Sequence, residues 1–241
     1  MKRFFIFALI AVLALTVLAG CKPAVYKDGT YIAVSNATDK GYMKAEVTIA
    51  KDKITAVKLF GYNDLAVEKP EAYPWPEYHT ALTELPKRMI AKNSWDVEIV
   101  SKATGTSNQS KEAVKRAMEK ALVKPASTAK NFDGTFMAKS EPDARGAWTI
   151  VWVTVAADKI TDVKIHGTRN VTETNAAGES VTKTVRKDET YSWAEYHTAL
   201  VELPKRFVAA NGPNVDAVTA ATSTSTQAKE AVTRALESAK R

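Results

Sequence analysis

The alternation of apolar and polar positions predicts strands in the early part of each half of the chain. Residues 47–49 and 54–59 are rich in apolar, often β-branched residues with threonine or lysine between them, and the short polar segment Lys51-Asp52 predicts a tight antiparallel hairpin. The counterparts in the second half are 150–155, which is nearly all apolar, and 160–165. Each half therefore begins with an antiparallel sheet.

Helices are predicted after the strands. Apolar residues at spacings of three and four indicate an amphipathic helix near the end of each half. These residues are Ala113, Val114, Ala117, Met118, Ala121 and Leu122 in the first half, and Ala228, Ala231, Val232, Ala235, Leu236 and Ala239 in the second. Upstream, residues 78–84 predict a short helix, and Pro86 suits the first turn of a separate one. Strands followed by helices indicate an α+β fold.

The two halves are copies of one unit. Residues 77–88 return as residues 195–206 with one difference, at an offset of 118. The predicted hairpins are offset by only 106, so the second copy carries about twelve extra residues within 168–189. Residues 175–178, Asn-Ala-Ala-Gly, have turn-forming composition and predict a lengthened loop or hairpin there.

The N-terminus has the pattern of a bacterial lipoprotein signal. Lys2-Arg3 precedes an apolar run over residues 4–17, which is shorter than a membrane-spanning helix needs, and a small-residue site ends at Cys21. Cleavage would leave Cys21 to carry several lipid chains, enough for stable anchoring. We therefore expect a membrane-anchored protein on the extracytoplasmic side.

This reading sets the expected division of the chain. It comprises a signal peptide (1–20), a lipid-anchored tether (21–27), the first copy (28–123), a linker (124–131) and the second copy (132–241).

The composition excludes several classes of cofactor and partner. Cys21 is the only cysteine, so the domains have none for disulfides, iron–sulfur clusters or covalent c-type haem. The formal charge of +7 falls to about +5 without Lys2 and Arg3, and the basic residues are scattered. We interpret them as a solvated surface that could favour an anionic partner, and expect no nucleic-acid binding.

Each copy runs through a Ser/Thr-rich element into its last helix. These elements are residues 101–107 and 219–225, and the pairs Thr106/Gln109 and Thr224/Gln227 have the form of a capping box. A helix N-terminus offers free N–H groups and a positive dipole end to a phosphate. On this chemistry alone, the hydroxyl groups could equally serve only as helix caps.

The second element resembles the signature of the FMN-binding domain family. Residues 216–225 read Asp-Ala-Val-Thr-Ala-Ala-Thr-Ser-Thr-Ser, close to the family pattern of Asp, two variable residues, Ser/Thr, Gly, Ala, Thr, a variable residue, Thr and Ser. The resemblance implies FMN joined through its phosphate to Thr222 by a flavin transferase. Asp216, Thr219 and Ala221 match the motif, whereas Ala220 replaces its glycine.

The first copy matches the same pattern less closely. Ser101, Ala103 and Thr104 agree with it, but Glu98 replaces the aspartate and Lys102 replaces the glycine. The resemblance implies a second flavin at Thr104, although Lys102 could hinder the transferase or could pair with a phosphate.

Two duplicated aromatic pairs are further candidates. His79 and His197 have no second histidine or cysteine at ligand spacing, so we expect no metal site, and they either lie near the flavin or serve the fold. Trp75 and Trp193 are candidates to cover the isoalloxazine ring, or are core aromatics.

The family occurs in exported subunits of sodium-pumping NADH:quinone oxidoreductase and Rnf complexes, and in lipoproteins of extracellular electron transfer. The resemblance therefore implies an electron carrier with membrane or extracellular redox partners, rather than an enzyme with its own substrate. Two alternatives remain open. One is a flavin-free envelope lipoprotein that acts as an interaction module or surface antigen, and the other is a domain that binds FMN noncovalently.

Overall fold

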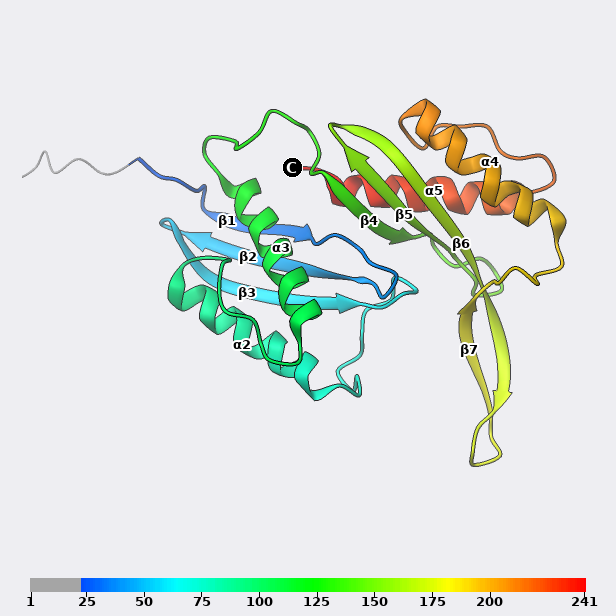
Figure 1. The fold of residues 1–241 in the computed structure, drawn as a ribbon, viewed down its shortest axis with the longest axis horizontal. Helices are drawn as coiled ribbons and strands as arrows, with labels where there is room; N and C mark the ends of the chain where they lie inside the picture. The colour runs from blue at the N-terminus through cyan, green and yellow to red at the C-terminus, as the bar shows by residue number, and fades with distance from the viewer. Residues whose placement is uncertain (1–22) are drawn as a thin grey trace, which may run out of the picture.

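A computed structural model describes residues 23–241 and shows two α+β units that lie side by side (Figure 1). The lipidation candidate Cys21 and the signal segment lie outside the described residues. The first copy consists of strands β1 (Gly29–Val34), β2 (Tyr42–Ala50) and β3 (Lys53–Tyr62), then helices α2 (Pro76–Lys92) and α3 (Thr104–Ala121). Its three strands form an antiparallel sheet in the order β1-β2-β3.

The second copy repeats this order and adds one strand. It consists of β4 (Gly134–Lys139), β5 (Thr149–Ala156), β6 (Lys159–Thr174) and β7 (Ser180–Arg186), then α4 (Ala194–Ala210) and α5 (Thr222–Ala239). Its sheet order is β4-β5-β6-β7. The predicted α+β class and internal duplication are thus confirmed.

The predicted hairpin turn is present in both copies. Lys51 and Asp52 both have positive φ, at 52° and 61°, and Ala157 and Asp158 repeat this geometry at 49° and 62°. Two consecutive residues with positive φ match the right-handed twist of the strands that they join. The local sequence therefore sets the register of each hairpin.

Helices cover one face of each sheet. In the first copy, α3 packs against β1 and β2 while α2 packs against β3, and the second copy repeats this arrangement with α5 and α4. Val47 of β2 and Val114 of α3 meet in the first core, and Val153 of β5 and Val232 of α5 meet in the second. The two apolar helices predicted from the 3–4 spacing are therefore the helices that complete each core.

The prediction of two short helices around Pro86 is wrong. One continuous helix, α2, spans residues 76–92 with Pro86 inside it, and α4 likewise contains Pro204. Tyr78, Leu85 and Met89 are all buried on the same face, so the apolar stripe continues through the proline. Burial of this stripe outweighs the hydrogen bond that an internal proline removes.

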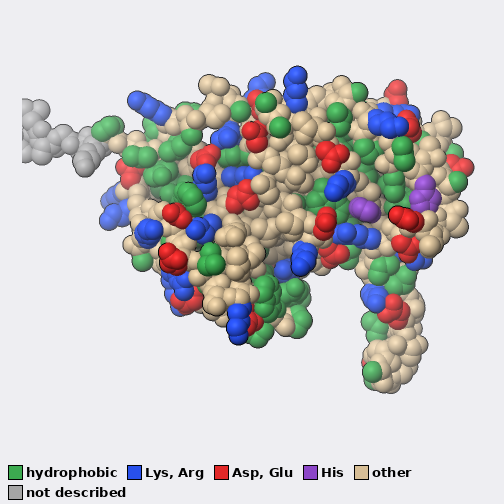
Figure 2. All heavy atoms as spheres, in the orientation of Figure 1, with side chains coloured by type: hydrophobic (Ala, Val, Ile, Leu, Met, Phe, Trp, Pro, Cys, Tyr) green, Lys and Arg blue, Asp and Glu red, His purple; other side chains and the backbone are tan. Residues whose placement is uncertain are grey.

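The extra residues of the second copy form a hairpin, as one of the predicted alternatives required. β6 extends to Thr174 and pairs with β7 around the turn at residues 175–178. This β6–β7 hairpin projects from the body of the molecule in Figures 1 and 2. Figure 2 also shows basic side chains interspersed with acidic ones over the visible face.

The outer face of the second sheet is covered by the first copy. Ile150 and Trp152 of β5 are buried and pack with Ala66 from the loop after β3. The equivalent positions in β2 are Lys44 and Glu46, which form an ion pair with an N–O distance of 3.6 Å. The replacement of two charged residues by two apolar ones thus marks where the units join.

Polar contacts strengthen this junction. The backbone N–H of Ala37 donates to the carbonyl of Thr135 at 2.8 Å. The buried Arg116 guanidinium donates to the carbonyls of Val34 (2.8 Å) and Asp133 (2.9 Å), one from each copy. Within residues 23–241, none of the helices is long and apolar enough to span a membrane.

Candidate functional site

Each Ser/Thr element stands at the start of a helix, as predicted. Thr222 is the first residue of α5 and Thr104 is the first residue of α3, and both side chains are exposed. The preceding residues, Ala221 and Ala103, are fully buried N-caps. The two candidate attachment hydroxyls are therefore accessible at the positive ends of two equivalent helices.

The position that carries glycine in the family motif has left-handed backbone geometry. Ala220 has φ 59° and Lys102 has φ 61°. Glycine adopts such angles without penalty, whereas a residue with a Cβ pays about 1–2 kcal/mol. The two departures from the motif therefore leave the turn intact at some cost in strain. Both side chains are exposed.

A buried serine ties each motif turn to its helix. Ser225 Oγ accepts a hydrogen bond from the N–H of Val218 at 3.0 Å and donates to the carbonyl of Ala221 at 2.9 Å. In the first copy, Ser107 Oγ accepts from Val100 N–H at 3.1 Å. This contact fixes the loop that precedes the candidate attachment threonine.

The predicted capping boxes are wrong. Each helix begins three residues earlier than that prediction required, and within the described chain neither N-cap makes a side-chain cap hydrogen bond. Instead, Gln227 donates to the carbonyl of Ala147 at 3.1 Å, and Gln109 donates to the carbonyl of Gly41 at 3.1 Å. The glutamines hold loops of the sheet, which leaves the first-turn amides of both helices for a ligand.

An arginine from the preceding helix donates hydrogen bonds to the backbone of each motif. Arg206 Nη1 donates to the carbonyls of Asp216 (2.9 Å) and Ala217 (3.2 Å). Arg88 makes the same pair of contacts in the first copy, with Glu98 and Ile99. These arginines thus hold the backbone of the motif through their guanidinium groups. Asp216, Thr219 and Ser101 are exposed on the same loops.

A cavity of about 440 Å³ adjoins the start of α5. Its lining includes Ser223 and Thr224 of the helix and Trp193, Tyr191 and Lys187 from the segment before α4. Thr222 directly precedes Ser223 in α5 and is exposed, although it is not itself among the lining residues. The candidate Trp193 is thus placed on the cavity wall beside the motif.

The first copy has the equivalent cavity, with a volume of about 1260 Å³. Gly105 and Thr106 of α3 line it, together with Trp75 and Lys69. Its lining also includes Tyr42 and Tyr62, whose rings stack with centroids 4.7 Å apart and planes within 3°. Burial, together with the Glu68 carboxylate, raises the pKa of Tyr62 to about 12, so its hydroxyl stays protonated.

A lysine that sequence reasoning missed lies in each cavity. Lys187 Nζ lies 4.1 Å from the ring centroid of Tyr191, and Lys69 Nζ lies 4.6 Å from that of Tyr73. Burial lowers the pKa of Lys69. The sequence contains a signal for these lysines, because the repeat extends upstream of the Glu-Tyr-His segment. It reads Lys-x-Glu-x-Tyr-x-Trp-x-Glu-Tyr-His and begins at Lys69 in the first copy and Lys187 in the second.

The duplicated histidines hold backbone rather than a ligand. His79 Nε2 donates to the carbonyl of Tyr73 at 2.7 Å, and His197 Nε2 donates to the carbonyl of Tyr191 at 2.6 Å. Neither is among the cavity-lining residues of the described chain. They position the tyrosines that face the lysines. Residues 23–241 contain no cluster of His, Cys, Asp and Glu suited to a metal ion.

The residues around each cavity suit FMN. Free amides at a helix N-terminus suit its phosphate, and the tryptophan and tyrosine rings offer flat apolar surface to the isoalloxazine. A lysine ammonium on the same wall suits the electron-rich pyrimidine edge of the ring. The fold and these residues form two copies of a candidate binding site for an aromatic ligand that carries an anionic phosphate.

Comparison with known proteins identifies that ligand. Residues 40–119 and 146–237 both match the family described as FMN-binding domain. The chain therefore belongs to this family and is a flavin-binding protein with FMN as its cofactor. The two matched regions together contain both motifs, both lysines and both cavity tryptophans.

Two individual proteins are similar to parts of the chain. An uncharacterized protein of Treponema pallidum (strain Nichols) is 36% identical over 105 residues, which is 44% of this chain and 25% of that protein. The chain thus spans about a quarter of this relative's length. A Clostridium perfringens protein of known crystal structure is 26% identical, with a TM-score of 0.35 over 40% of this chain and 88% of that one.

Proposed function

We propose that this protein is an electron carrier held at the extracytoplasmic face of a membrane, with FMN joined covalently to Thr222 and a second FMN joined to Thr104. One observation carries the proposal. In each copy, an exposed threonine begins a helix, and the next two residues of that helix line a cavity that also contains aromatic residues and a lysine.

The helix N-terminus favours this attachment chemically. A phosphodiester at Thr222 keeps one negative charge, which the dipole of α5 and the free amides of its first turn stabilise. The hydroxyl is exposed, so a separate flavin transferase can reach it. The buried Ser225 and Ala221 fix the backbone on either side, and the attachment point is therefore held in one place.

The cavity residues then hold the ring. FMN when bound supplies one- and two-electron chemistry, whereas the chain itself orients the ring and controls its access to water. Trp193 and Tyr191 supply aromatic surface, and Lys187 supplies a positive charge beside them. The cavity is partly open to the surface, which suits exchange of electrons with partner proteins.

The two copies differ at the attachment turn. Lys102 stands where the second copy has Ala220, and its ammonium lies 4.0 Å from the Glu77 carboxylate on an exposed surface. Such an exposed pair contributes little and breaks readily. Lys102 is then free to pair with a phosphate on Thr104, two residues away.

Membrane attachment through Cys21 is part of the same proposal. A Cys21→Ser variant is expected to lose incorporation of labelled fatty acid and to move from the membrane fraction to the soluble fraction. Incorporation of the label into the variant would overturn the assignment of Cys21 as the lipid-bearing residue.

The attachment sites are tested by coexpression with a flavin transferase. Intact mass and in-gel flavin fluorescence are compared for the wild type, Thr222→Ala, Thr104→Ala and the double variant. We expect two FMN increments in the wild type, one in each single variant and none in the double variant. A matched control is Thr226→Ala, which removes an exposed threonine from the same helix and should keep both increments. Unmodified wild type would refute covalent attachment.

A further inference from the structure

We infer that the second copy holds one wall of the first copy's cavity in place, with Arg186 of β7 as the positioning residue. FMN would then bind more tightly in the first copy when the two units are docked, which rests on the proposed occupancy of both copies. The inference begins from the two loops that form one wall of the first cavity, residues 38–42 and 62–64.

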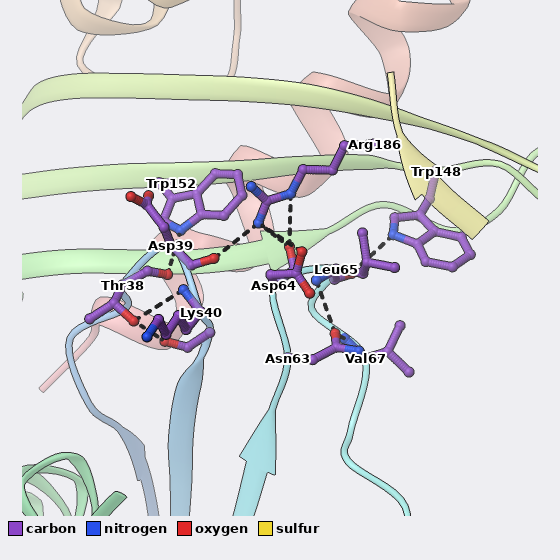
Figure 3. A network of polar contacts seen from close by, with 11 residues as sticks. Thr38, Asp39, Lys40, Asn63, Asp64, Leu65, Val67, Trp148, Trp152 and Arg186 are labelled. Carbon is purple, nitrogen blue, oxygen red and sulfur yellow. Dashed lines mark hydrogen bonds and ion pairs between the residues drawn. The ribbon is translucent and has the colours of Figure 1, made fainter. Parts of the chain in front are cut away.

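Arg186 holds both of these loops at once. Its guanidinium donates to the carbonyl of Asp64 through Nη2 at 2.6 Å and through Nε at 3.2 Å, and to the carbonyl of Asp39 at 3.2 Å. Its Nη2 also lies 3.4 Å from the Asp64 carboxylate. Figure 3 shows the two loops converging on this one side chain. Asp39 and Asp64 both line the first cavity, so the contact acts directly on its wall.

Two tryptophans of the second copy hold the same loops. Trp152 Nε1 donates to the carbonyl of Thr38 at 3.1 Å, and Trp148 Nε1 donates to the carbonyl of Leu65 at 3.1 Å (Figure 3). The Arg186 guanidinium lies 4.8 Å from the centre of the Trp152 ring. The second copy thus supplies three side chains that fix the carbonyl groups of the first copy's loops.

The wall of the second cavity is held by residues of its own copy. Its corresponding loop, residues 143–146, is held within the same copy, because Asn170 Nδ2 of β6 donates to the carbonyl of Arg145 at 2.8 Å. The extra hairpin therefore supports its own cavity through Asn170 and the neighbouring cavity through Arg186. The first copy has no equivalent hairpin, which is why its wall depends on the other unit.

Packing contacts connect the junction between the copies with the stacked rings of Tyr42 and Tyr62. Tyr42 packs against the interface cluster that contains Ile150 and Trp152, and it also lines the first cavity and stacks on Tyr62. A shift of the docked units would therefore move the ring pair that lines the cavity. Binding and docking should stabilise each other to the same extent, as linkage requires.

The positive charge of Arg186 should also favour FMN binding in the first copy. Arg186 offsets the carboxylate of Asp64 at the rim of the first cavity. Without the guanidinium, that carboxylate would face an anionic ligand unpaired. Loss of Arg186 should therefore weaken binding in the first copy through both a looser wall and a less favourable charge.

The test follows FMN binding in each copy separately by hydrogen exchange with mass spectrometry. The full chain is expressed without a flavin transferase and titrated with FMN, and exchange is read at residues 38–42 and 62–75 for the first copy and 143–149 and 187–193 for the second. In Arg186→Ala, we expect faster exchange of 38–42 and 62–67 before FMN is added. The FMN midpoint of the first copy should rise about tenfold, within the range of roughly 5- to 150-fold typical of coupled sites. The second copy's midpoint should not change.

A matched control lies on the same hairpin. Lys183 pairs with Glu173 at 2.6 Å across the hairpin, so Lys183→Ala should leave both midpoints unchanged. Trp152→Phe keeps the packing but removes the hydrogen bond to Thr38, and should shift the first midpoint in the same direction as Arg186→Ala. This variant decides the question if Arg186→Ala fails to fold.

The outcomes separate this inference from the proposed function. A wild-type chain whose cavities gain no protection from FMN would contradict FMN binding at these sites. A wild-type chain protected in both copies, with Arg186→Ala and Trp152→Phe giving the same first-copy midpoint, would overturn the inference alone.

Discussion

Removal of the Ser225 hydroxyl tests whether the motif turn depends on one buried contact. In Ser225→Ala, the N–H of Val218 loses its only side-chain partner among the described residues while both positions remain buried. An unsatisfied buried donor costs about 1–3 kcal/mol. For a chain of this size, 1 kcal/mol lowers Tm by roughly 2–4 °C, so Tm should fall by roughly 2–12 °C.

The assay combines calorimetry with hydrogen exchange at the Val218 amide. Thr226→Ala is the control, because it removes an exposed hydroxyl from the next position of the same helix and should change stability by less than about 0.5 kcal/mol. We expect the Val218 amide to lose protection only in Ser225→Ala. Equal Tm values for the two variants, with the Val218 amide still protected, would refute the argument that this serine fixes the attachment loop.

Three further predictions concern stability. Burial, followed by the Arg186 charge, lowers the pKa of His166, so the unfolded chain binds more protons below about pH 6.5. Stability should fall as the pH falls from about 6.5 toward the lowered pKa, and the urea midpoints of His166→Gln should lack this slope. Gly61→Ala places a Cβ 2.5 Å from the Tyr78 hydroxyl and should lower the free energy of unfolding in urea by about 1–3 kcal/mol. In Gly167→Ala the nearest contact of the new Cβ is 3.0 Å, so the loss should be smaller. Equal losses in the two variants would contradict the steric argument. Lys102→Gly relieves a positive φ and should gain up to about 1 kcal/mol in the same assay, and a loss would show that the lysine side chain stabilises the turn.

Local features of the sequence were enough to predict the hairpins and the amphipathic helices. The turn at Lys51 and Asp52 and the alternating strands around it depend on neighbouring residues, and so does the apolar spacing of α5. Pro86 led to a wrong helix boundary because the local preference of proline for a helix start contributes less free energy than burial of the continuous apolar stripe from Tyr78 to Met89. The extent of a helix is thus decided by its partner surface.

The site was only partly predictable for a similar reason. The motif pointed to Thr222 and Thr104 as candidate attachment residues at helix starts, but Gln109 and Gln227 bond to loops that are distant in sequence rather than to their own helices. The junction between the copies depends on equally distant contacts. A comparison of the two copies does point to this junction, because the charged Lys44-x-Glu46 pattern of the first copy becomes Ile150-x-Trp152 in the second.

The central claim is that Thr222 carries FMN through its hydroxyl group. The most direct measurement is tandem mass spectrometry of proteolytic peptides from the chain coexpressed with a flavin transferase, with fragmentation that retains the phosphoester. We predict that the FMN increment lies on Thr222 in the peptide that contains residues 216–227, and not on Ser223, Thr224 or Ser225. The increment on any of those neighbours, or its absence from this peptide, would contradict the assignment.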